Sequence, residues 1–161
     1  MDIAINQAEY SNTPAGPVVH IFGREADGTA HEVKVTGFRP YFWVRESEAF
    51  RPHSDKVEVT DDRAFSIKGE PLIRLYTQKP TDVRIVREAY HHFEADIPFA
   101  TRFLIDLGLT GGVSFPSETC SYLPLSFHQQ TLSLHSSASL QQTYNPQSLR
   151  LCRIQILTSV P

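Results

Sequence analysis

The sequence predicts an α+β fold: a mostly antiparallel sheet or partial barrel with two short helices, followed by a tail of low charge. Three observations lead to this prediction. Short runs rich in β-branched and aromatic residues fill much of the chain before residue 78. After Pro80 the apolar residues change to helical spacing. Residues 1–110 carry 30 of the 33 charged residues, whereas residues 111–161 carry three.

Five strands are expected from this pattern. Proline cannot donate to a strand ladder, so Pro40 should lie at the start or the edge of a strand that continues into the aromatic run from Tyr41 to Trp43. The loop between the first two strands contains Asp27-Gly28, which is typical of hairpin turns. The predicted strands span 17–22, 31–35, 41–44, 56–60 and 71–77.

Two helices are expected after residue 80. Apolar residues recur at helical spacing through the first, over 81–92, and either Thr81 or Asp82 can serve as its N-cap. The second helix is predicted over 98–107, with Gly108 as its stop signal.

The change in charge predicts the domain organisation. A folded core needs a charged exterior to stay soluble, and the tail, rich in Ser, Gln, Thr and Leu, does not supply one. We therefore predict one domain over 1–112, a linker or poorly ordered segment over 113–148, and a separate final segment over 149–161.

Composition excludes several classes of protein. A net charge of -3 argues against an extended basic surface, so any contact with nucleic acid must be a local patch. Cys120 and Cys152 lie far apart without a CxxC motif, which predicts no metal site and no cofactor and suits a reducing compartment. The N-terminus lacks a secretion signal and no apolar run is long enough to span a membrane. We predict a cytoplasmic protein with no membrane partner.

Common catalytic motifs are not found in the sequence. It contains no GxSxG, P-loop, HExxH or GxGxxG pattern. Asp61-Asp62 is interpreted as part of a solvated loop, and His91-His92 as a surface pair on a helix. Composition and spacing alone leave the partner of this α+β domain open.

Three longer motifs are more informative. "FRPYFWV", "GEPLIRLYTQKPTDVRIVREAY" and "FEADIPFATRFLIDLGL" follow one another in this order. Their order and content resemble the N-terminal domain of archaeal family B DNA polymerases, over about residues 3–112. The resemblance implies the N-terminal-domain fold of that family and single-stranded template DNA as the partner.

In many members of this family the domain captures uracil in the template strand ahead of the polymerase site. A base taken from a single strand needs a close-fitting slot whose apolar and aromatic walls replace the lost stacking. Backbone groups near Tyr41 and in the turn from Asp96 to Pro98 can read its Watson–Crick edge, and tight packing would exclude the methyl group of thymine. Arg102 is expected to hold the pocket wall or to meet a phosphate. The residues that match the family's pocket are Tyr10, Pro40, Tyr41, Pro80, Val83, Phe99 and Arg102.

The final segment, "LRLCRIQILTS", resembles the first strand of the family's 3′–5′ exonuclease domain. The positions of its metal-binding Asp and Glu are occupied here by Gln155 and Leu157, which are unsuited to a hard divalent cation. The alternative is a chance likeness in a decayed tail. Neither interpretation gives this chain a catalytic site.

The leading functional hypothesis is a non-catalytic, truncated or stand-alone template-binding domain that recognises uracil. A second hypothesis is a subunit or fragment of a split DNA polymerase and exonuclease, active only with a separate catalytic chain. A third is a decayed fragment without activity.

Overall fold

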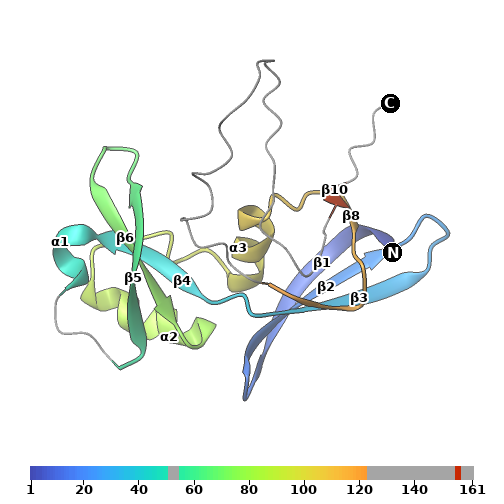
Figure 1. Cartoon of the computed structure of the whole chain (residues 1–161), viewed down its shortest axis with the longest axis horizontal. Helices are drawn as coiled ribbons and strands as arrows, with labels where there is room; N and C mark the ends of the chain where they lie inside the picture. Colours follow the sequence, from blue (N-terminus) through green and yellow to red (C-terminus); the bar gives the residue numbers. More distant parts are fainter. Residues whose placement is uncertain (51–54, 123–154, 157–161) are drawn as a thin grey trace, which may run out of the picture.

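The computed structural model describes residues 1–50, 55–122 and 155–156, which form two sheets with a helix between them (Figure 1). Pairing is antiparallel throughout the described strands, except between the third and ninth. This mostly antiparallel architecture confirms the predicted fold class. The large sheet contains, in spatial order, β10 (Gln155–Ile156), β8 (Gly112–Ser114), β1 (Asp2–Thr13), β2 (Gly16–Arg24), β3 (Ala30–Thr36) and β9 (Thr119–Ser121). The small sheet contains β5 (Val57–Phe65), β6 (Pro71–Thr77), β4 (Tyr41–Arg45) and β7 (His92–Phe93).

The five predicted strands are present as β2 to β6, and the structure adds β1 and the short strands β7 to β10. The hairpin between β2 and β3 turns at the predicted glycine, Gly28, whose φ of 89° suits a residue without a side chain. Pro40 directly precedes β4, as expected for a residue that cannot donate to the ladder. Within β2, Val19 and Ile21 are fully buried while their neighbours Val18, His20 and Phe22 are half-buried, which is the alternation of a sheet with one covered face.

Each sheet packs on a hydrophobic core of its own. The inner face of the small sheet packs Phe42 and Val44 of β4 against α2 (Pro80–Val86). The large sheet packs against α3 (Phe99–Asp106), where Phe103 is fully buried, and Gly108 with φ 61° ends this helix as predicted. A one-turn helix, α1 (Glu46–Ala49), follows β4.

The predicted helix over 81–92 is too long. Regular helix ends at Val86, a 3-10 turn η1 (Arg87–Ala89) follows, and Tyr90 is extended with φ -130°. The chain leaves the helix because β7 pairs with β4, opposing Phe93 to Trp43. Neither predicted N-cap holds that position.

The N-cap of α2 is Lys79, with Pro80 in the first turn. Asp82 acts from the third helical position, where its Oδ2 accepts a 3.2 Å hydrogen bond from the Lys79 amide.

The carboxylate pair Asp61-Asp62 does not lie in a loop. Both residues belong to β5, within a break of register between Val59 and Arg63. The extra residues of such a bulge leave the ladder, which explains their polar character. Asp62 Oδ2 lies 3.3 Å from Arg74 Nη1, so this carboxylate is paired within the sheet.

Residues beyond 112 continue the large sheet through β8 and β9, and Phe115 is buried against the same core. The domain boundary and the linker stay predictions, since residues 123–154 lie outside the described part of the chain. Gln155 belongs to β10, which pairs with β8, whereas Leu157 is not among the described residues. The exonuclease-strand interpretation also stays a prediction. No described helix has the length and apolar character required to cross a membrane.

Candidate functional site

A pocket of about 430 Å³ opens where β1, the start of β4, α2 and the start of α3 meet. The seven residues predicted for the site all line it, although they come from four separate segments: Tyr10, Pro40, Tyr41, Pro80, Val83, Phe99 and Arg102. Six further residues complete the lining: Arg84, Arg87, Ala95, Asp96, Ile97 and Pro98.

The walls of the pocket are mainly apolar. Phe99 and Val83 are largely buried, at 7% and 8% exposure, so their side chains are held by the cores behind them. Tyr10 is 40% exposed and lies at the outer edge, with its ring edge-on to Phe99 at a centroid distance of 5.4 Å. Such a geometry presents ring faces and edges to a flat ligand.

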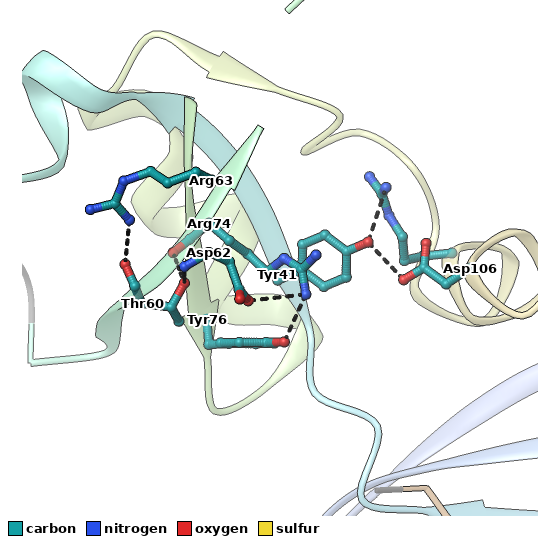
Figure 2. A network of polar contacts seen from close by, with 8 residues as sticks. Tyr41, Thr60, Asp62, Arg63, Arg74, Tyr76 and Asp106 are labelled. Carbon is teal, nitrogen blue, oxygen red and sulfur yellow. Dashed lines mark hydrogen bonds and ion pairs between the residues drawn. The ribbon is translucent and has the colours of Figure 1, made fainter. Parts of the chain in front are cut away.

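Two contacts fix the side chain of Tyr41, one at its hydroxyl and one over its ring. Its hydroxyl donates a 2.7 Å hydrogen bond to Asp106 Oδ2, as Figure 2 shows. The guanidinium group of Arg74 lies 4.5 Å from the centroid of its ring. Burial, with the hydrogen bond to Asp106, raises the pKa of Tyr41 well above its usual range. The hydroxyl therefore stays protonated and acts as a donor.

Arg102 is bound to its own protein at several points. Its Nη1 donates a 2.6 Å hydrogen bond to Glu94 Oε2 and its Nη2 a 2.8 Å bond to the main-chain oxygen of Glu94. A longer bond of 3.4 Å runs from Nη1 to the hydroxyl of Tyr41. Of the two roles predicted for Arg102, these contacts favour holding the pocket wall over meeting a phosphate.

The segment between β7 and α3 supplies main-chain groups. Residues 95–96 form a turn, and no hydrogen bond joins the amides of Ala95 or Asp96 to another residue that the structure describes. The oxygen of Ala95 accepts a 3.3 Å bond from Arg87 Nη1. Free amides at a pocket wall can donate to carbonyl oxygens of a ligand.

Two arginines at the pocket were not among the predicted residues: Arg84 of α2, and Arg87, the first residue of η1. Arg84 and Arg87 line the pocket, and Arg84 is exposed. A signal for them was present, because residues 80, 83, 84 and 87 share the spacing of one helix face. Among the residues described, no group of three or more His, Cys, Asp or Glu side chains could hold a metal ion.

Trp43 lies outside the pocket, although its neighbours line it. Its ring is covered by the guanidinium group of Arg74 at 4.7 Å and meets Tyr41 edge-on at 6.3 Å. The tryptophan thus supports Tyr41 from the strand and does not line the cavity itself.

Comparison with known proteins shows which family this chain is related to. DNA polymerase 1 of Pyrococcus abyssi is 34% identical over 128 residues, a match that covers 66% of this chain and 16% of the relative. The chain is homologous to archaeal family B DNA polymerases. DNA polymerase 2 of Aeropyrum pernix is also 34% identical, over 121 residues, with 62% of this chain and 15% of the relative covered.

The solved structure of a family B polymerase is also similar to this chain. The structure of the enzyme from Pyrobaculum calidifontis superposes with a TM-score of 0.52 at 30% identity, covering 68% of this chain and 16% of that one. The chain therefore spans about one sixth of the length of these family B polymerases, at their N-terminal region. No family model matches the chain.

Proposed function

We propose that this domain binds single-stranded DNA and captures a uracil base from it in the pocket described above. The observation that carries the proposal is the meeting of seven sequence-predicted residues, from four segments, around one cavity. The homology to family B DNA polymerases supports DNA as the partner, and a cytoplasmic location stays part of the proposal.

The pocket suits a base in size and chemistry. Its volume of about 430 Å³ falls within the roughly 300–1,000 Å³ typical of small-molecule sites. Phe99, Pro40 and Pro80 offer apolar surface in place of neighbouring bases, and stacking of this kind is worth about 1–3 kcal/mol per base. The free amides of Ala95 and Asp96 can donate to carbonyl oxygens of uracil.

The phosphates of the strand have a separate set of partners. Arg84 is exposed on α2, and among the described residues it forms no ion pair or hydrogen bond through its side chain. Arg87 lies one helical turn away, half-buried. Arg87 pairs with Glu88 at 3.4 Å and donates to the oxygen of Ala95, so Arg84 is the better partner for a phosphate beside the captured base. A local cation of this kind fits a domain whose overall charge is negative.

The test is a binding titration of the chain with two single strands that differ only by uracil or thymine at one position. The uracil strand is expected to bind more tightly, within the roughly 10- to 200-fold range that one methyl group is worth in a fitted site. Equal affinities for the uracil and thymine strands would contradict the proposal.

Surface composition supports a second candidate, a domain that works with a separate polymerase chain. Phe65 and Ile67, near the turn between β5 and β6, are 75% and 104% exposed, and exposed apolar side chains that lie together often mark a protein interface. This role predicts that the chain restores activity to a family B polymerase from which the N-terminal region has been removed. Unchanged activity after mixing would argue against it.

A further inference from the structure

Glu94 has an unusual backbone for its residue type. Its φ of 58° makes it the one non-glycine residue with positive φ among those that the structure describes. The left-handed region is unfavourable for a residue with a side chain, and such a conformation persists where the surroundings enforce it. Other contacts must therefore hold Glu94 in this conformation.

Arg102 supplies the enforcing contacts. From α3, its guanidinium group donates two hydrogen bonds to Glu94. One, of 2.6 Å, goes to the side-chain Oε2, and the other, of 2.8 Å, goes to the main-chain oxygen. The Arg102 side chain is only 6% exposed, while that of Glu94 is 51% exposed. A buried guanidinium group without an anion is costly, so each partner stabilises the position of the other.

The residues that follow Glu94 form one side of the pocket. Ala95, Asp96, Ile97 and Pro98 all line it, and the amides of Ala95 and Asp96 make no hydrogen bond within the described part of the chain. At one end this segment continues into α3, and at the other it is held by the bonds from Arg102 to Glu94 and by the 3.3 Å bond from Arg87 to the oxygen of Ala95. The bonds to Glu94 are therefore among the contacts that set the position of this wall.

We propose that Glu94 is a positioning residue which, through Arg102, holds the segment 95–98 close enough to exclude the methyl group of thymine. This inference rests on the proposed function, because it names the residue that sets the specificity of the same site. Glu94 does not line the pocket, so its effect on the base is transmitted through Arg102 and the main chain.

The test compares Glu94→Gln with Glu58→Gln. Glu58 is a matched control, because it also accepts a 2.6 Å bond from an arginine, Arg39, outside the pocket. For Glu94→Gln we expect the ratio of thymine-strand to uracil-strand dissociation constants to fall by at least threefold, mainly through tighter binding of thymine. For Glu58→Gln the ratio should stay that of the unaltered chain. An unchanged ratio in Glu94→Gln, beside a clear preference in the unaltered chain, would overturn the inference and leave the proposed function standing.

Two further measurements separate positioning from general loosening. Amide hydrogen exchange of Glu94→Gln should rise in the peptide that covers 94–98 and nowhere else; a rise throughout the domain would overturn the assignment. In the background of Arg102→Met, which has no donor for Glu94, Glu94→Gln should change the ratio little, because the effect passes through Arg102. If the two substitutions lower the ratio of dissociation constants additively in the double variant, Glu94 acts by another route. Equal binding of both strands by the unaltered chain would remove the proposed function together with this inference.

Discussion

The hydroxyl of Tyr41 and the carboxylate of Asp106 are 2.7 Å apart, although 65 residues separate them in the sequence. Tyr41 begins β4 of the small sheet, and Asp106 ends the helix that packs on the large sheet. The bond therefore ties the two halves of the fold together beside the candidate pocket, which draws its walls from both.

Tyr41→Phe should remove this tie while leaving the ring in place. We expect the free energy of unfolding to fall by about 0.5–1.5 kcal/mol, the usual net worth of one intramolecular hydrogen bond. Urea denaturation measures the change. Tyr10→Phe serves as the control, because Tyr10 is 40% exposed and should lose little stability. Equal losses in the two variants would mean that the bond to Asp106 contributes nothing.

Asp106→Asn should have an effect that depends on pH. Burial raises the pKa of the Asp106 carboxyl, while the hydrogen bond from Tyr41 and the charges of Arg102 and Arg74 oppose the rise. A raised pKa in the folded state stabilises the fold fully below the unfolded pKa of about 3.9, and this contribution is lost as the pH rises through the folded pKa.

Asparagine stays neutral, so Asp106→Asn should compare more favourably with the unaltered chain at about pH 7 than at about pH 3. The measurement is the difference in unfolding free energy between the two proteins at each pH. A difference that moves in the opposite direction would contradict the assigned shift.

Phe115→Ala tests where the domain ends. Phe115 lies beyond the predicted boundary at residue 112, yet it is 1% exposed within the core of the large sheet. Removing a buried phenylalanine should cost about 3–5 kcal/mol. A chain shortened after residue 112 should be less stable than one shortened after residue 122, by thermal denaturation. If both shortened chains melt at the same temperature, the boundary at 112 holds.

Local patterns predicted the five strands β2 to β6 but only part of the helices. β4 and β6 are rich in aromatic and β-branched residues, so their type could be predicted from composition. β1 could not, because in "DIAINQAEYSNT" only Ile3 is buried, and the strand depends on pairing with β2 and β8. The helical spacing that continued to Phe93 was overridden by the pairing of that residue with Trp43 in β4.

The pocket was predictable only in part. Its seven residues came from the resemblance to a family, since no spacing rule brings Tyr10 next to Phe99 across the chain. Main-chain amides carry no signature in the side-chain sequence, and neither does the backbone of Glu94. Arg84 and Arg87 could have been found from the helix face that they share with Val83.

No metal-dependent exonuclease activity is expected from the chain. Gln155 and Leu157 stand where the resemblance places two carboxylate ligands, and neither side chain suits a hard divalent cation. Incubation of labelled single-stranded DNA with the chain and Mg²⁺ or Mn²⁺ should release no nucleotides. Release that persists in a preparation free of contaminating nucleases would contradict this expectation.

Val83→Gln tests the pocket itself. The longer polar side chain should occupy the space of the base and abolish the preference for uracil strands. Val83 is 8% exposed and packs in the core beneath the small sheet, so a stability loss of about 1–3 kcal/mol is expected as well. Loss of binding could then follow from loosened packing, and a matched variant is needed.

Val86→Gln is that variant. Val86 lies on the same helix and in the same core, with 5% exposure, but it does not line the pocket. Its substitution should lower the melting temperature about as much as Val83→Gln while leaving the uracil preference intact. Both proteins are titrated with uracil and thymine strands below their melting temperatures. If the two variants lose the preference equally, the pocket at Val83 is not the site of recognition, and the convergence of Tyr41, Val83 and Phe99 serves packing alone.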